Sequence, residues 1–427
     1  MKIPLIFVPL LFVPALALGQ RSSISAEKVS AGIALDLDML ISEAMDHNQE
    51  VQAALHQMRV LDARAVQAGA LEDPELNYMR EQMPGFRWNE AFMQKIELMQ
   101  MIPFPSKLSA RRTIADYQSE HAHHDHLERV NDVIARLKNT FFELWYVQHA
   151  IALNDESERL LRQFLQIAKT KFGVGIVPQQ DVLKALVELE KLENQLLTLR
   201  EQEGVTKSMM MALLNREPTD TLGTAFLSEA ASFTANPDTL VGLAMQYRPM
   251  LLHDSLGVEE GKAMLTLARR EYLPDFKIGL QYVTEPIGVF KGWSLIAGIS
   301  IPFAPWTLRK AGARVEEADA TIERATATYH ASRDMIVAAV REMYLRASSQ
   351  CRQLASYRRA ILPQAEQSLQ ASLTAYQNGT SDFLMLIDAY RTLVELRMEA
   401  LMTRMQFEQS VAELEKAVGL TGIANTK

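Results

Sequence analysis

The residues of this chain best suited to chemistry are four histidines in one short segment, His121, His123, His124 and His126. In a helix, side chains three or four residues apart share a face, so His121 and His124 would lie together and Glu128 would follow one turn after His124. Imidazole is a common ligand of transition metals. The segment is therefore a candidate metal site, although a solvated helix face rich in histidine explains the same spacing and is the simpler interpretation.

Sulfur-containing residues offer little further chemistry. The chain has 21 methionines, including the run 209–211, which suggests copper(I), but methionine more often packs helices together. The single cysteine, Cys351, lies in a predicted helix, so no intramolecular disulfide can form. The sequence also contains no glycine-rich phosphate loop and no recognisable Ser/His/Asp arrangement. We therefore expect neither an enzyme nor a bound cofactor.

The N-terminus predicts an exported protein. Residues 1–19 combine a short basic start with an apolar run and end in small residues that a signal peptidase reads, so cleavage is expected before Gln20. A membrane anchor is the alternative, but the run contains prolines and is short for a span. Cys351 lies far from this site, so no lipid-anchor cysteine is expected there. The net charge of −8 argues against nucleic acid as a partner.

The elements that must position these residues occur twice along the chain. The first repeat spans residues 20–220 and the second spans 237–419, followed by a tail at 420–427. Each repeat is predicted to contain a helix, two short strands, a very long helix, a sharp turn and a long return helix, an order that no compact domain would choose. The matching segments are Ala44-Met45 and Ala244-Met245, Pro74-Glu75-Leu76 and Pro274-Asp275-Phe276, and Ile102-Pro103-Phe104 and Ile301-Pro302-Phe303.

Four segments alternate between apolar and polar residues, as strands do. The first repeat places them at about 76–83 and 91–101, and the second at about 275–284 and 292–301. Four strands cannot close a barrel, and an open apolar sheet invites aggregation, so closure by several chains is the economical solution. A soluble amphipathic hairpin is the alternative for a single repeat. Alternation alone does not say which strand face meets lipid.

The long helices do not suit a globular monomer. No proline interrupts residues 107–171, so this segment is predicted to form one helix of roughly 100 Å. A return helix follows at about 178–214, and the second repeat has helices at about 308–377 and 382–418. Pro363 is expected to kink the helix at 308–377. Helices of this length must lie in a coiled-coil wall.

Two turn segments carry a resemblance to a known family. Phe172-Gly-Val-Gly-Ile-Val-Pro-Gln-Gln-Asp-Val and Tyr376-Gln-Asn-Gly-Thr-Ser-Asp-Phe-Leu resemble the two periplasmic hairpin turns of TolC-type outer-membrane efflux proteins, and the resemblance extends from about Leu37 to Gly419. It implies a mainly α fold with a membrane β-barrel portion. Duplicated long helical hairpins would form a periplasmic α-barrel tunnel, and the four strands of each chain would contribute to a trimeric 12-stranded barrel.

The resemblance also implies a function and partners. The chain would be a homotrimeric, passive exit duct in the cell outer membrane, surrounded by outer-membrane lipid and extending into the periplasm. An inner-membrane pump of the RND type would supply the energy through a periplasmic adaptor protein. Tight helix reversals favour glycine in any case, because glycine tolerates positive φ. The hairpin-tip residues that the adaptor would contact are Gly173, Val174, Gly175, Gly379, Thr380 and Ser381.

The second tip carries residues that the resemblance assigns to a periplasmic gate. Asp388 matches one of two aspartates that ring the entrance in the family, whereas the other position is Met385 here. Three copies of Asp388 near one axis would attract cations. The arginine often found after Gly-Thr is replaced by Ser381, which leaves that lock without its arginine. The residues that match those tying neighbouring hairpins shut are Tyr376, Asp181 and Gln180.

The cargo is the least determined property. Residues 100–108 resemble the strand-to-helix turn of heavy-metal efflux members, in which Pro-x-Pro-Gly-Lys is common, with Ser106 in place of that glycine. Together with the histidines, this turn favours heavy-metal cations. Drugs and other organic solutes, or a type I secretion substrate, are the alternatives for the same duct. A periplasmic coiled-coil scaffolding protein would explain the helices but not the strands, and a metal-dependent enzyme would explain only the histidines.

Overall fold

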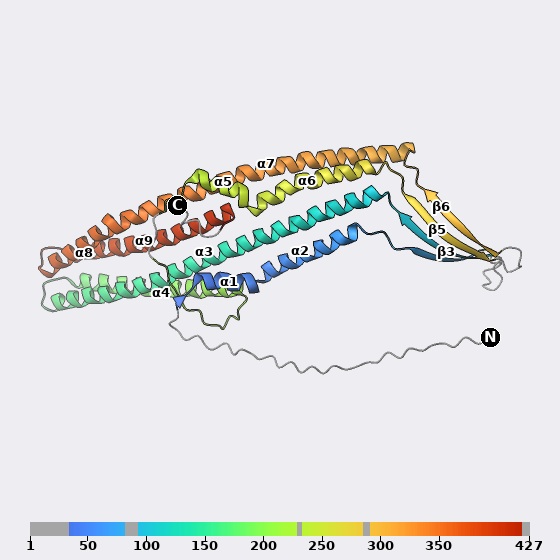
Figure 1. Cartoon of the computed structure of the whole chain (residues 1–427). Helices are drawn as coiled ribbons and strands as arrows, with labels where there is room; N and C mark the ends of the chain where they lie inside the picture. The colour runs from blue at the N-terminus through green and yellow to red at the C-terminus, as the bar shows by residue number, and fades with distance from the viewer. Residues whose placement is uncertain (1–33, 82–92, 229–232, 285–290, 421–427) are drawn as a thin grey trace, which may run out of the picture.

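The computed structural model describes residues 34–81, 93–228, 233–284 and 291–420. The chain forms a long, narrow rod, with a four-stranded sheet at one end and the tips of two helical hairpins at the other (Figure 1). The predicted signal peptide and all but the first residue of the predicted tail lie outside the described residues. None of the described helices is both long enough and apolar enough to cross a membrane.

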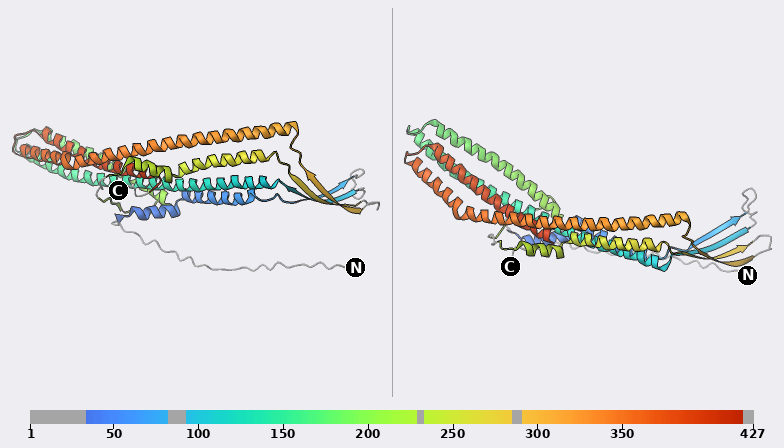
Figure 2. Two further views of the ribbon diagram at one scale, coloured as in Figure 1. Left: turned by 45° about the horizontal axis from the view of Figure 1, so that its top comes forward. Right: turned by 90° about the horizontal axis from the view of Figure 1, so that it is seen from above.

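The two repeats fold with the same element order and run along the same rod (Figures 1 and 2). The first contains α1 (Leu37–His47), α2 (Gln49–Ala68), β2 (Glu75–Glu81), β3 (Met93–Ile102), α3 (Pro105–Gly173) and α4 (Gln179–Leu214). The second contains α5 (Pro237–Tyr247), α6 (Pro249–Arg270), β5 (Phe276–Thr284), β6 (Lys291–Ile299), α7 (Pro305–Ser356), α8 (Leu362–Gln377) and α9 (Phe383–Val418). Two short strands, β1 (Ala34–Leu35) and β4 (Thr224–Ala225), pair in parallel.

The helix α3 runs for 69 residues without interruption, which corresponds to about 100 Å. Pro105 stands in its first turn, where an N–H would lack an intrahelical partner in any case. Buried side chains recur at three-and-four spacing, as at Leu137, Phe141 and Leu144. Near the tips, apolar side chains of α3, α4, α8 and α9 form one buried cluster. The two hairpins therefore share a core at that end of the rod.

The long helix of the second repeat contains the irregularity that Pro363 predicts. α7 ends at Ser356, a π-helical segment η3 (Tyr357–Ile361) follows, and α8 starts at Leu362. Proline has no N–H to donate, and its ring clashes with the carbonyl four residues earlier, so the helix widens just before it. The helical column changes direction at this junction (Figure 2, right). The predicted kink is therefore confirmed.

The sheet is antiparallel in the order β2-β3-β5-β6, so the strand hairpins of the two repeats join through β3 and β5. The register places residues of like character opposite one another. One face carries the rows Leu76, Leu98, Leu280, Leu295 and Tyr78, Ile96, Tyr282, Trp293. The other face carries the row Asn77, Glu97, Gln281, Ser294. The sheet thus has one apolar face and one more polar face, a distinction that requires the register.

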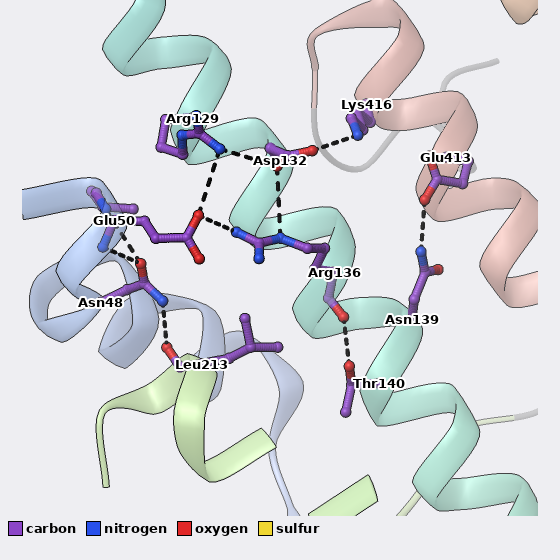
Figure 3. Close-up of polar contacts among 11 residues, drawn as sticks. Asn48, Glu50, Arg129, Asp132, Arg136, Asn139, Thr140, Leu213, Glu413 and Lys416 are labelled. Carbon is purple, nitrogen blue, oxygen red and sulfur yellow. Dashed lines mark hydrogen bonds and ion pairs between the residues drawn. The ribbon is translucent and has the colours of Figure 1, made fainter. Parts of the chain in front are cut away.

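Charged side chains link the two repeats where α2, α3 and α9 meet (Figure 3). Glu50 of α2 pairs with Arg129 and Arg136 of α3, at 3.5 and 2.7 Å. Asp132 of α3 pairs with both arginines at 3.6 Å and with Lys416 of α9 at 2.6 Å. Because these side chains are partly exposed, each pair contributes at most about 1 kcal/mol. Their alternating charges hold three helices in register rather than supplying most of the stability.

Candidate functional site

The two hairpin tips close with the same backbone hydrogen bonds. At the end of α3, the N–H of Ile176 donates to the carbonyl of Lys171, and the N–H of Gly175 donates to the carbonyl of Phe172, both at 2.9 Å. At the end of α8, the N–H groups of Thr380 and Gly379 repeat this pattern at 3.0 and 3.1 Å. Gly175 and Gly379 have φ angles of 76° and 75°, which glycine adopts most easily. Turn geometry accounts for both glycines.

The side chains of the two tips differ although the backbones agree. Val174 and Ile176 of the first tip are 67% and 64% exposed, whereas the second tip has Asn378 and Thr380 at the matching positions. The first tip is therefore apolar at its surface and the second is polar. The residues predicted to contact an adaptor all reach the surface: Gly173, Val174, Gly175, Gly379 and Thr380 are exposed, and Ser381 is half-buried.

Of the predicted gate residues, the structure brings Tyr376 and Asp181 together. The Tyr376 hydroxyl donates to Asp181 Oδ2 at 3.4 Å, and both residues are buried. Burial raises the pKa of Asp181, and burial together with the neighbouring carboxylate raises the pKa of Tyr376. Lys171 donates to the Tyr376 carbonyl, and its Nζ lies 4.9 Å from the centre of the ring. These contacts tie one hairpin of the chain to the other.

The other predicted gate residues lie at the surface, away from this contact. Asp388 and Met385 are exposed on α9, three residues apart and hence on one helix face. Gln180 is exposed in the first turn of α4 and lines a groove of about 300 Å³ between α4 and α9. Asp388 therefore presents its carboxylate to solvent beside a methionine, and Gln180 does not join the buried Tyr376–Asp181 contact.

An ion pair that the sequence did not predict crosses the same groove. Arg391 of α9 donates from Nε to Glu188 of α4 at 3.1 Å, and Lys191 pairs with the same carboxylate at 3.0 Å. The hydrogen bond from Arg391 holds the pKa of the buried Glu188 below its ordinary value. Arg391 lies one turn after Asp388, so this pair adjoins the predicted gate. The spacing of Glu188 and Lys191 is visible in the sequence, whereas a partner 203 residues away is not.

The four clustered histidines have different surroundings. His121 faces α6, where its Nε2 atom lies 3.2 Å from Glu260 Oε2, whereas His123 is exposed. Burial lowers the pKa of His124 and of His126. Successive residues of a helix point in different directions, so side chains spread over more than one turn cannot all converge. In the described part of the chain, no three His, Cys, Asp or Glu side chains are already arranged to hold a metal ion.

The turn at residues 100–108 has an architectural role. Lys107 is 5% exposed and donates from Nζ to Asp275 Oδ1 at 2.8 Å and to the Leu273 carbonyl at 2.7 Å. Asp275 also accepts from the N–H of Phe104 at 2.9 Å. Burial opposes ionisation of Asp275, but the hydrogen bond from Lys107 brings its pKa below the ordinary value. This lysine fastens the start of α3 to the start of β5, and by itself it carries no information about cargo.

The chain thus consists of duplicated helical hairpins with a two-faced sheet at one end. Residues 40–216 and 240–420 match the family described as outer membrane efflux protein. The chain belongs to this family, so the resemblance carried by the hairpin turns is confirmed. It is an outer-membrane efflux channel, and it is a passive channel rather than an enzyme.

Individual relatives agree with this assignment. The cobalt-zinc-cadmium resistance protein CzcC of Cupriavidus metallidurans is 22% identical over 396 residues, which cover 90% of each chain. The fold is similar to that of CusC, with a TM-score of 0.80 and 16% identity over 93% of this chain and 96% of that one. It is also similar to the outer-membrane channel OprN, with a TM-score of 0.78 and 16% identity over 91% and 90%. At these identities the solved structures show the fold alone.

Proposed function

We propose that this chain is the exit duct of a tripartite efflux system in which three copies form one channel. The observation that carries the proposal is the sheet. Within the described residues, β2 and β6 each pair on one side only. Open sheet edges leave backbone N–H and C=O groups that a membrane cannot satisfy. Pairing β6 of one copy with β2 of the next, around a threefold axis, gives a closed barrel of 12 strands.

The two faces of the sheet fit such a barrel. Trp293 and Tyr78 are 69% and 54% exposed at one end of the apolar face, and Phe303 and Trp306 are 62% and 76% exposed beyond the other end. Outer-membrane barrels carry an apolar band flanked by aromatic girdles at both interfaces. We therefore assign the apolar face to lipid and the face that carries Gln281 to the lumen. A periplasmic scaffolding protein, the alternative from another class, gives this two-faced sheet no purpose.

The helical end supports an entrance that can close. The Tyr376–Asp181 and Glu188–Arg391 contacts tie the hairpins of one chain together. The exposed Asp388 lies one helical turn from Arg391. In a threefold assembly, three Asp388 carboxylates near the axis would concentrate cations at the entrance. We propose that the gate of the channel lies at this end of the helical hairpins, at the level of Asp388.

The partners follow from the two ends of the rod. An inner-membrane pump of the RND type would provide the energy, and a periplasmic adaptor would contact the hairpin tips at residues 173–175 and 379–381. Support comes from the apolar surface of the first tip, since exposed apolar side chains mark interaction sites. Export by cleavage of residues 1–19, with no lipid-anchor cysteine, would deliver the chain to the outer membrane.

We propose divalent heavy-metal cations as the cargo. The support is the similarity to CzcC over 90% of each chain and the placement of His121 beside Glu260. Drugs and other organic solutes, or a type I secretion substrate, are the competing cargoes for the same duct. Deletion of the chain from its host, followed by growth on zinc, cobalt and an organic toxicant, separates these cargoes. Sensitivity to the organic toxicant alone would reject the metal assignment.

Conductance in a planar lipid bilayer tests the duct itself. We expect purification in detergent to yield a heat-sensitive trimer with cation-selective currents. The double variant Tyr376→Phe with Asp181→Ala should conduct more than the wild type, because it loses the buried contact between hairpins. A pure trimer that never conducts, even with this double substitution, would overturn the proposed function.

A further inference from the structure

We propose that the channel wall contains a weak binding site for a divalent cation of the zinc or cobalt type, built where the two repeats meet. The ligands are His121 and Asp125 of α3 and His253 and Glu260 of α6. Only His121 belongs to the histidine cluster visible in the sequence. The site deepens the metal-cargo part of the proposed function, while the cation binding itself does not depend on that function.

The donor atoms already lie in two ligand pairs. His121 Nε2 is 3.2 Å from Glu260 Oε2, and His253 Nε2 is 3.5 Å from Asp125 Oδ1. Two ligands of one tetrahedral Zn²⁺, each about 2.0 to 2.1 Å from the metal, lie about 3.3 Å apart. The two imidazole rings touch edge to face, with centres 4.3 Å apart. Both pairs therefore have the spacing of metal ligands, and they stand side by side.

Neighbouring side chains orient two of these ligands. Asp254 Oδ1 lies 3.1 Å from His253 Nδ1, which directs the other ring nitrogen toward Asp125. Gln118 donates to Glu260 Oε1 at 2.9 Å, which leaves Oε2 toward His121. Such second contacts are how proteins fix the tautomer and direction of metal ligands.

A cavity of about 340 Å³ adjoins the pairs, lined by His121, His253, Asp254 and Glu260 among others. Gly257 also lines it, and a Cβ atom there would lie 3.9 Å from His121 Cε1. Both ring nitrogens of His121 and the Asp254 Oδ2 atom are buried without a well-directed hydrogen bond. Buried polar atoms in native proteins nearly always have a partner, which is frequently a water or an ion. The cavity thus has room and unsatisfied donors and acceptors.

The ligand chemistry selects the class of cation. Two imidazole nitrogens and two carboxylate oxygens suit borderline divalent cations such as Zn²⁺ and Co²⁺, whereas copper(I) prefers sulfur. The two pairs do not converge on one centre in the described structure, so one ion can bind all four ligands only if side chains rotate, for which the 67% exposed Asp125 has room. Arg324 of α7 also lines the cavity and opposes a cation. Each of these features weakens binding, and a conduit needs sites that release what they bind.

The experiment is a titration of the purified full-length protein with Co²⁺, whose visible absorption reports tetrahedral nitrogen and oxygen ligands. We expect one Co²⁺ per chain in the wild type. His121→Asn and His253→Gln should each weaken binding at least about tenfold, and Asp254→Asn about tenfold through loss of orientation. Arg324→Gln should tighten binding. The exposed His123→Ala is the matched control and should bind as the wild type does.

Two results overturn the site: no saturable Co²⁺ binding by the wild type, or equal affinity in His121→Asn, His253→Gln and His123→Ala. Because the histidine variants could misfold, Glu260→Gln, which keeps the shape of the side chain, tests the same site and should also weaken Co²⁺ binding. The trimer content of each protein is measured. Bilayer conductance measured without metal tests the channel function independently of the cation site. A conducting trimer that binds no Co²⁺ rejects only the site, whereas a Co²⁺-binding trimer that never conducts rejects only the duct.

Discussion

Arg248 occupies in the second repeat the position that Asn48 occupies in the first, and each closes the end of a return helix. Asn48 Nδ2 donates to the carbonyl of Leu213 at 2.8 Å, and Arg248 Nη1 donates to the carbonyl of Lys416. Both side chains are buried, at 4% and 8% exposure. The last carbonyls of a helix have no intrahelical partner. Asn48 satisfies the Leu213 carbonyl, whereas the Lys416 carbonyl also accepts from the N–H of Gly419 at 3.1 Å. The two repeats therefore make the same kind of contact to the last turn of a return helix with different residues.

Loss of Asn48 should destabilise the junction between the short and long helices. Its side chain also accepts from the N–H groups of Glu50 and Val51, as the N-cap of α2. Asn48→Ala is expected to lower the free energy of unfolding by about 1 to 2 kcal/mol. Asn194→Ala, at an exposed helix position, is the control. Denaturant unfolding of both variants measures the difference, and equal stabilities would contradict the capping role.

Lysine substitutions distinguish the two faces of the sheet. Leu280→Lys should reduce assembled trimer, because a lysine facing lipid near the bilayer midplane costs about 2 to 4 kcal/mol. Gln281→Lys, on the opposite face of the same strand, should assemble normally. Electrophoresis of unheated samples quantifies the trimer. Equal assembly of the two variants would remove the barrel from the proposal.

Removal of Asp388 should change ion selectivity. If three copies ring the entrance, Asp388→Ala lowers the local negative potential and weakens both cation selectivity and block by multivalent cations. Asp334→Ala removes an exposed aspartate of α7, far along the rod from the tips, and should leave both properties as they are. Reversal potentials in asymmetric salt provide the measurement. Unchanged selectivity and block in Asp388→Ala would place the gate elsewhere.

Acid should favour the closed contact between Tyr376 and Asp181. Burial raises the pKa of Asp181 in this contact above the value that it regains in water. The contact is therefore favoured fully below the ordinary pKa of aspartate and is weakened as the pH rises through the raised value. We expect the open probability to fall as the pH is lowered from neutral to about 4.5.

Asp181→Asn cannot titrate and should abolish that pH dependence. Glu188 should respond to pH in the opposite direction. Its pKa is held low, so its ion pair with Arg391 is present at neutral pH and is lost only as the pH falls below the ordinary range of glutamate. Single-channel recordings at several pH values test both statements. An open probability that rises on acidification in the wild type would contradict the assignment.

Lys107 should be needed for the junction between sheet and helices. Lys107→Met keeps the aliphatic bulk but leaves Asp275 without its charged donor, which is expected to cost about 1 to 3 kcal/mol. Lys277→Met, at an exposed position of β5, serves as the control. Thermal unfolding of the detergent-solubilised protein measures both. If Lys107→Met were no less stable than Lys277→Met, the contact between Lys107 and Asp275 would not stabilise this junction.

Local features could be predicted well from the sequence. The uninterrupted helix α3, the break before Pro363, the glycine turns and the four alternating strands all depend on residues within a few positions of one another. Periodicity and turn chemistry act at that range, so they can be recognised in a single sequence. The four histidines show the limit of such reasoning, because their spacing does not say which neighbour each side chain meets: His121 faces Glu260 of α6, whereas His123 is exposed.

Long-range pairing was decided only by the tertiary structure. The Tyr376–Asp181 contact joins residues 195 positions apart, and His121 meets His253 of the other repeat. In a duplicated chain each element has two nearly equivalent possible neighbours, and periodicity shows which face is apolar but not which element covers it. By itself the sequence determined the elements, their repeat and their turns. Only the tertiary structure determined the register of β3 against β5, the Tyr376–Asp181 contact and the His121–Glu260 pair, because each of these requires residues from both repeats to meet.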